Sequence, residues 1–268
     1  MKITVAIRLS SYTIVAEKAG LSQKTEKTCV CLVQEQIMDK KQLDTFFTNK
    51  RIVHLFIKIN GMGGYGWVFP KKNHVNIGIG EFTSSVDSSK PKKNIRERYE
   101  DYIAVLKQRK IIPESFIIED VKGGILPVFP LKKTYGDRVL LCGDAAGFIN
   151  PITGEGIYYA MMSGTMAAEV IVDALKTDRI NARFLSRYQK KWLKEFGNDL
   201  KFLGRFNRQW GKNSETFVRL MSHDKKFAKL IIGVTGGQVN ITRYFPVLIL
   251  SYFSALIKDF IKNKKEKN

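Results

Sequence analysis

Cysteine is scarce in this chain of 268 residues, and its spacing argues against two common uses. Cys29, Cys31 and Cys142 form an odd set without the paired spacing of a disulfide framework or of a zinc site. The apolar run at the N-terminus is also too short for a secretory signal. We therefore expect an intracellular protein without a disulfide framework.

Histidine is equally scarce. His54, His74 and His223 are scattered along the chain and form neither a catalytic triad nor a metal-ligand pattern. We assign them no role and predict no metal site.

Acidic residues are outnumbered by basic ones, 25 against 45, which gives a net charge of +20. Such an excess favours polyanions such as nucleic acid, anionic lipid head groups or phosphorylated substrates. No nucleic-acid-binding module is recognisable, and the charge alone is weak support, so we predict no nucleic-acid partner. The length allows one large domain or two small ones.

The stretch Arg138–Leu175 organises the rest of the chain. Its sequence predicts a buried strand, Arg138–Cys142, then a loop rich in small residues, Gly143–Gly156, then a helix up to Leu175. Glycines allow a backbone to approach a ligand closely, and the amides at a helix N-terminus suit an anionic or electron-rich group. An acid at the end of the strand, Asp144, can accept hydrogen bonds from sugar-like hydroxyls. The alternative is a plain strand–turn–helix with a polar turn.

The segment GDAAGFINPITGEGI closely resembles the second flavin-binding motif of the para-hydroxybenzoate hydroxylase-like FAD enzymes, and most of all the geranylgeranyl reductases. The resemblance implies that Asp144 binds the ribityl hydroxyls of FAD and that Pro151 shapes the turn beside the flavin. It implies that the amides around Gly154, Gly156 and Ile157 face the flavin ring and the ribityl chain. The cofactor site it predicts consists of Gly143, Asp144, Ala145, Pro151, Gly154, Glu155, Gly156 and Ile157.

A second motif, GYGWVFPKK at Gly64–Lys72, places Tyr65, Trp67 and Phe69 on one side of a strand. An aromatic ladder in an ordinary core is one interpretation. A Tyr-x-Trp-x-Phe-Pro pattern is also typical of the geranylgeranyl reductases, where such aromatics line the tunnel for the prenyl chain. An apolar polyene needs a long apolar wall of this kind. The resemblance therefore implies substrate binding by Tyr65, Trp67, Phe69 and Pro70.

The front of the chain departs from the family pattern. Tyr12–Leu21 matches a helix that follows an Asp-Gly turn in the family, but Leu9 and Ser10 occupy the positions of that turn. No G-x-G-x-x-G unit precedes Gly20, although the family uses one to hold the ADP half of FAD. We expect either a fragment or a degenerate relative, and a separate N-terminal chain that completes the site is one alternative.

The fold class expected is α/β, in the mixed α+β sense, with a partial flavin-binding layer, an antiparallel substrate sheet and a helical C-terminal region. The predicted domains are 1–27 (remnant of the FAD-binding domain), 28–135 (substrate domain), 136–180 (return to the FAD-binding domain) and 181–268 (helical region). The pattern predicts strands at Ile3–Ile7, Thr28–Gln36, Arg51–Ile59, Gly66–Lys71, Val75–Phe82, Ile117–Val121 and Gly124–Val128, and helices at Ser11–Leu21, Lys40–Asn49 and Asn94–Arg109.

The C-terminal region is helical and basic. Its apolar residues at near-helical spacing predict one buried face: Phe184, Tyr188, Trp192, Phe196, Leu200, Leu203 and Phe206, as far as Trp210. The interleaved lysines and arginines form either a solvated face or a surface for lipid phosphate. The apolar run Tyr244–Ile257 is too short for a comfortable membrane-spanning helix, which needs roughly 20 residues. With its basic tail it fits an interfacial helix or a docked terminal helix.

The function expected is an FAD-dependent reductase that saturates C=C bonds of geranylgeranyl or other isoprenoid chains in membrane lipids or their precursors. The alternatives are an FAD-dependent monooxygenase or halogenase on the same fold, and a truncated, non-catalytic lipid-binding remnant. We expect an isoprenoid lipid substrate and an electron donor such as ferredoxin or NADPH. The location expected is cytoplasmic, at the membrane surface. No catalytic residue is assigned.

Overall fold

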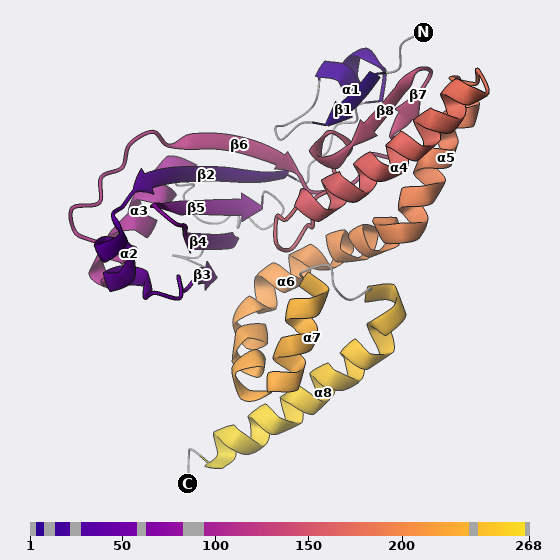
Figure 1. Cartoon of the computed structure of the whole chain (residues 1–268). Coiled ribbons are helices and arrows are strands. Elements are labelled where there is room, and N and C mark those ends of the chain that lie inside the picture. The colour runs from indigo at the N-terminus through magenta and orange to yellow at the C-terminus, as the bar shows by residue number, and fades with distance from the viewer. Residues whose placement is uncertain are drawn as a thin grey trace. The chain divides into compact units, whose positions relative to one another are not determined.

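The computed structural model describes residues 4–7, 14–21, 28–57, 63–82, 94–235 and 241–265 (Figure 1). They form two compact units, one of residues 26–126 and one of residues 1–25 together with 127–268. The four-part division expected from the sequence stays a prediction. The turn at Leu9-Ser10 and the polar loop Ser84–Lys93 lie outside the described residues.

The unit of residues 26–126 is built on a five-stranded sheet with the order β3-β4-β5-β2-β6. The pairs β2–β5, β4–β5 and β3–β4 are antiparallel, as the sequence predicts. Its elements are β2 (Thr28–Ile37), α2 (Lys40–Phe47), β3 (His54–Ile57), β4 (Gly64–Pro70), β5 (His74–Phe82), α3 (Ile95–Gln108) and β6 (Lys122–Pro127).

One face of this sheet carries the core of the unit. Val68 of β4 and Ile77 and Ile79 of β5 are fully buried there, against side chains from both helices. The α3 residues in this cluster are Ile95, Tyr99, Tyr102, Ile103 and Leu106. The helix predicted at Asn94–Arg109 is therefore confirmed, and one of its faces is buried.

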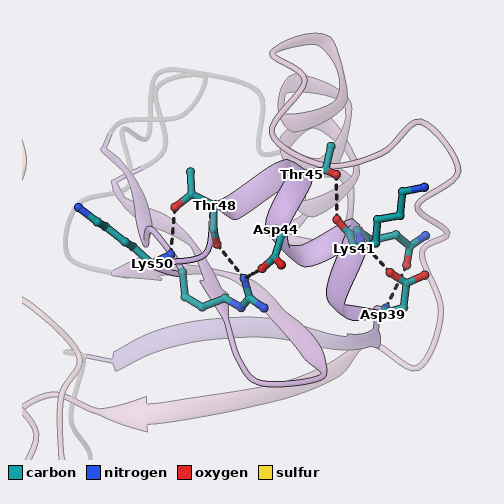
Figure 2. A network of polar contacts seen from close by, with 8 residues as sticks. Asp39, Lys41, Asp44, Thr45, Thr48 and Lys50 are labelled. Atoms are coloured by element: carbon teal, nitrogen blue, oxygen red, sulfur yellow. Dashed lines mark hydrogen bonds and ion pairs between the residues drawn. The ribbon is translucent and has the colours of Figure 1, made fainter.

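Helix α2 is held at both ends by polar contacts (Figure 2). At its start, the Asp39 carboxylate accepts from the Gln42 amide at 2.7 Å, and the Gln42 side chain accepts from the Asp39 amide in return. At its end, the Arg51 guanidinium donates to Asp44 at 2.5 Å and to the Thr48 carbonyl at 2.7 Å. The two reciprocal bonds between Asp39 and Gln42 form a capping box, which satisfies backbone amides that the start of the helix leaves unpaired.

The strand predicted at Ile117–Val121 is wrong, and the physical reason is a buried glutamine. Gln34 of β2 is 1% exposed, and its side chain bonds two backbone groups of this segment. It donates to the Ile117 carbonyl at 2.6 Å and accepts from the Glu119 amide at 3.2 Å. The segment thus satisfies its backbone through a side chain, while Phe116 and Ile118 pack into the core.

The other unit contains a small sheet of order β1-β8-β7 and a series of helices. β1 pairs with β8 in parallel, and β7 pairs with β8 in antiparallel fashion. The elements are β1 (Thr4–Ile7), α1 (Ile14–Lys18), β7 (Tyr135–Gly136), β8 (Val139–Cys142), the 3-10 turn η3 (Gly143–Ala146), α4 (Ile157–Lys176), α5 (Ala182–Trp192), the π-helical turn η4 (Leu193–Gly197), α6 (Asn198–His223), α7 (Lys225–Thr235) and α8 (Ile241–Lys265).

Helices α4 and α5 and the turn η4 bury a continuous apolar face against β8. The polar atoms of the large residues in this core are satisfied. The Tyr188 hydroxyl donates to the Leu141 carbonyl at 2.8 Å, and the Trp192 indole donates to the Thr134 hydroxyl at 2.9 Å. The predicted buried residues Phe184, Tyr188, Trp192, Phe196, Leu200 and Leu203 are confirmed, while the side chains of Phe206 and Trp210 lie outside the described part.

Helix α8 packs one side on α6 and α7 through Leu248, Tyr252 and Ala255. It is longer than the apolar run that the sequence analysis judged too short to span a membrane. Its stretch Arg243–Lys262 is long and apolar enough to cross one, by length and composition alone, and little of it is buried. The length argument made from the sequence is thereby corrected.

Gly147 ends the turn after β8 and has no room for a side chain. Its φ is +73°, and a Cβ there would lie 2.2 Å from the Phe129 carbonyl oxygen. Only glycine adopts this conformation without strain, and the clash with backbone adds to the cost.

We expect Gly147→Ala to lower the free energy of unfolding by at least about 1 kcal/mol, because both the strain and the clash act on the folded state. Gly164→Ala is the matched control, since Gly164 lies within α4 with nothing within 4 Å of its added Cβ. It should raise stability by up to about 1 kcal/mol through better helix propensity. Urea unfolding of both variants checks this, and equal changes in the two would contradict the assignment.

Candidate flavin and substrate sites

The loop after β8 is pinned to α4 by Ser163. The Gly143 amide donates to the Ser163 hydroxyl at 3.0 Å, and that hydroxyl donates to the Ala160 carbonyl at 3.2 Å. Gly143 has a φ of +54°, so the chain turns sharply as the strand ends. Ser163 could not be singled out from sequence, because a lone serine within an apolar helix has no distinctive pattern.

A second polar residue, Asn150, shapes the next turn. It is fully buried, and its side-chain oxygen accepts from the Ile152 amide at 2.9 Å and the Thr153 amide at 3.3 Å. These bonds curl the chain around the buried Pro151. Asn150 was not among the residues predicted from sequence, although an Asn-Pro pair is a known turn signal.

Asp144 lies at the start of the loop that follows β8, half-buried on η3. A Cβ on Gly156 would lie 2.9 Å from its Oδ1, so the glycine allows the start of α4 to approach the carboxylate. Burial, with the charge of Glu155 as a smaller cause, raises the pKa of Asp144 from 3.8 to about 6. Among the described residues, none donates a recorded hydrogen bond to this carboxylate. A perturbed acid with spare acceptor capacity is typical of a functional site.

Helix α4 begins beside this acid with its first turn partly open. Its N-cap, Gly156, contributes no side-chain hydrogen bond, and Glu155 accepts from the Tyr158 amide at 2.8 Å. Ile157 and Met161 are 72% and 70% exposed, so an apolar patch borders the helix start.

The structure thus brings Asp144, Glu155, Gly156 and the helix start together, with Gly143 and Ala145 in the same turn. This set fits a ribityl chain: Asp144 would accept from its hydroxyls, and the helix start and apolar patch would lie beside a flat, electron-rich ring. The roles that the resemblance gives these residues stay predictions. No group of three or more His, Cys, Asp or Glu residues in the described ranges has a geometry for holding a metal ion.

The aromatic motif lies in the other unit, on the sheet face opposite the core. Tyr65, Trp67 and Phe69 are half-buried and follow one another along β4, with ring centroids 5.7 Å and 6.1 Å apart. In contrast, Val68 between them is fully buried in the core. The interpretation as an ordinary core ladder is therefore wrong, because the rings lie on the face away from the core cluster.

The ladder lies over a strip of small residues in β5. Gly80 is opposite Tyr65 and Gly78 is opposite Trp67, and a Cβ on Gly78 would lie 2.1 Å from the Trp67 ring. The Trp67 indole donates to Asn76 at 2.8 Å, which fixes the ring along the sheet. The result is a wall of aromatic rings along β4. Pro70 ends this strand and lies on the core side of the sheet.

Two solved structures share this fold. A geranylgeranyl bacteriochlorophyll reductase-like protein from Thermoplasma acidophilum aligns with a TM-score of 0.61 at 20% identity, over 74% of this chain and 48% of that one. A flavoprotein/dehydrogenase from Cytophaga hutchinsonii aligns with a TM-score of 0.61 at 17% identity, over 93% and 60%. The fold class is therefore the mixed α/β fold of such flavoproteins, as predicted.

Sequence comparisons indicate which family of flavoproteins the chain resembles. Residues 29–118 match the family described as geranylgeranyl reductase catalytic domain. The chain is 32% identical over 192 residues to digeranylgeranylglycerophospholipid reductase 2 of Methanopyrus kandleri, covering 70% of this chain and 46% of that protein. It is 34% identical over 184 residues to the corresponding reductase of Methanocaldococcus jannaschii, covering 66% and 43%. The resemblance to the geranylgeranyl reductases is confirmed, and the chain spans about half the length of these relatives.

The raised pKa of Asp144 predicts a specific pH dependence of stability. An acid whose pKa is higher in the folded than in the unfolded chain costs stability as the pH rises from about 4 through about 6. We expect Asp144→Asn to melt at a higher temperature than the wild type at pH 8 and at the same temperature near pH 4. Calorimetry at both pH values checks this, with Asp173→Asn on the exposed face of α4 as control. A constant difference at both pH values would contradict it.

Proposed function

We propose that this chain carries the substrate-binding and ribityl-binding parts of an FAD-dependent reductase that saturates C=C bonds in geranylgeranyl chains of membrane lipids. The observation that carries the proposal is the aromatic ladder on the face of the sheet away from the core. It lies within residues 29–118, the range that matches the geranylgeranyl reductase catalytic domain. That match also favours a reductase over a monooxygenase or halogenase.

The chemistry divides between cofactor and protein. Reduced FAD, when bound, would supply a hydride to one carbon of the double bond, an acid or a water molecule would supply the proton to the other carbon, and a donor such as ferredoxin or NADPH would reduce the flavin again. Asp144 binds the ribityl hydroxyls as a carboxylate, and such hydrogen bonds lower its pKa toward the ordinary value. The ladder of Tyr65, Trp67 and Phe69 holds the apolar chain and excludes water from it.

Flavin retention tests the cofactor site. The purified chain, mixed with FAD and passed through gel filtration, should keep flavin absorbance that dithionite bleaches. Asp144→Ala should weaken retention by roughly 10- to 100-fold, since hydrogen bonds to a charged group contribute about 1.5–3 kcal/mol. Asp173→Ala is the matched control and should retain FAD like the wild type.

The same holoprotein tests the reaction. With dithionite as reductant, it should add hydrogen to a digeranylgeranyl glycerophospholipid, as detected by mass spectrometry of the lipid. Trp67→Ala should keep FAD and lose most of the saturation. A chain that retains no FAD would instead support a non-catalytic lipid-binding remnant, and FAD retention without any lipid reduction would count against the substrate.

We further propose that α8 rests on a membrane surface. Its inner side packs on α6 and α7, and two ion pairs fix it there: Lys258 to Asp224 at 2.6 Å and Arg219 to Asp259 at 3.3 Å. Its outer side exposes large apolar residues, among them Leu250, Phe253, Ile257 and Phe260. An apolar strip beside basic residues is typical of an interfacial helix.

We expect the protein to sediment with vesicles that contain anionic lipid and to be released by high salt, because each Lys or Arg near such a surface contributes about 1 kcal/mol. Replacing Leu250 and Phe253 together by glutamate should abolish sedimentation. Val172→Glu, on the exposed side of α4, is the matched control and should leave it unchanged. Equal loss in both variants would show that charge alone, and not α8, mediates binding.

A further inference from the structure

A cavity of about 480 Å³ lies in the C-terminal part of the chain, where helices α6, α7 and α8 pack together (Figure 1). It belongs to the unit of residues 1–25 and 127–268, whereas the aromatic ladder belongs to the other unit. Ile152, from the loop after β8, also lines it, but none of the residues predicted to bind FAD does. Neither the flavin site nor the ladder therefore accounts for this cavity.

The lining of the cavity is almost entirely apolar. Of the fourteen described residues that line it, Asn213 and Tyr252 are the two whose side chains carry polar atoms. A polar or charged ligand would lose its hydrogen bonds to water there and find few partners to replace them. The volume falls within the range of roughly 300–1,000 Å³ that is typical of ligand pockets. The cavity therefore suits an apolar ligand.

Aromatic contacts at two levels of α8 show that the cavity is elongated. Phe202 of α6 and Phe245 of α8 meet edge to face, with ring centroids 5.2 Å apart. Further along α8, Tyr252 packs on Phe217 and Phe227, with centroids 5.6 Å and 6.2 Å away. All five rings line the cavity. Phe245 and Tyr252 are separated by about 10 Å along the helix axis, so the shape suits a linear chain.

Helix α8 forms the open edge of the cavity. Phe245, Ile249 and Phe253 recur every four residues and line it, yet they are 40%, 40% and 57% exposed. Phe227, on the opposite wall, is 1% exposed. The neighbouring Leu250 belongs to the exposed apolar strip of α8, for which we propose contact with a membrane. A hydrocarbon tail in such a membrane would enter the cavity without crossing water.

We propose that this cavity takes up a linear hydrocarbon tail of a membrane lipid, separately from the chain held by the ladder. Protein interiors contain few voids larger than a water molecule, and apolar atoms that fill one add van der Waals contacts with its lining. The source of the tail rests on the membrane contact proposed for α8. The site itself depends neither on that contact nor on the reductase reaction.

A titration without vesicles tests the site. The probe is cis-parinaric acid, a linear polyene fatty acid that fluoresces in apolar surroundings. Trp67→Ala serves as the background, so that the ladder contributes little, and we expect one probe per chain. Adding Val234→Phe should weaken binding by roughly 10-fold or more, because the larger side chain occupies space that methylene groups of the probe would fill. Val172→Phe, on the exposed side of α4, is the matched control and should bind like the background. Equal affinity of all three proteins would overturn the proposal.

A photolabel locates the tail in the wild type and covers the case in which Val234→Phe fails to fold. Vesicles with anionic lipid carry a phospholipid with a diazirine in its tail, and mass spectrometry maps the labelled residues. We expect labels on the buried Phe227 as well as on the exposed Leu250. Labels on Leu250 without Phe227 would overturn uptake into the cavity and leave the membrane contact standing. No label on either residue would count against the membrane contact itself. A free diazirine fatty acid that labels Phe227 when the phospholipid does not would overturn the membrane lipid as the source.

Discussion

The close approach of backbone segments around the end of β8 is the constraint on which the candidate cofactor site depends. Gly147 meets the Phe129 carbonyl, and Gly156 meets the Asp144 carboxylate, each at a distance that leaves no space for a Cβ. The Ser163 hydroxyl satisfies the Gly143 amide at the point where the strand turns. Together these contacts hold an acid next to a helix start, and a larger side chain at either glycine would separate them.

The sheet of residues 26–126 uses the strand period of two to make two different surfaces. Val75, Ile77 and Ile79 of β5 point to one face and bury the core with α3. Gly78, between Ile77 and Ile79, and Gly80, directly after Ile79, lie on the other face and leave room for aromatic rings and thiols. β-branched residues and glycines therefore alternate along one strand, and this alternation separates the part of the sheet that stabilises the fold from the part that can bind a ligand.

Pattern alone predicted the strand–loop–helix around Asp144 and the helix at Asn94–Arg109, because both follow from local periodicity. It could not tell which face of the sheet carries the core, since alternation places Tyr65, Trp67 and Phe69 together without saying what covers them. The strand predicted wrongly at Ile117–Val121 has a similar origin, because its hydrogen-bond partner is distant in sequence. Apolar, β-branched composition indicates a strand only where a partner strand supplies hydrogen bonds, and here the side chain of Gln34 supplies them. Long-range partners of this kind leave no local signal.

A comparison of two acids in the same unit shows why Asp144 points to a ligand. Asp224 caps α7, accepting from the Lys226 and Phe227 amides, and pairs with Lys258 at 2.6 Å. Lys258 is the main cause of its lowered pKa, so the fold itself favours the charged form. For Asp144 the fold disfavours the charged form, because burial and the charge of Glu155 raise its pKa. Among the described residues, none donates a hydrogen bond to its carboxylate. An acid that weakens its own fold at neutral pH, as Asp144 does, is typical of a functional site.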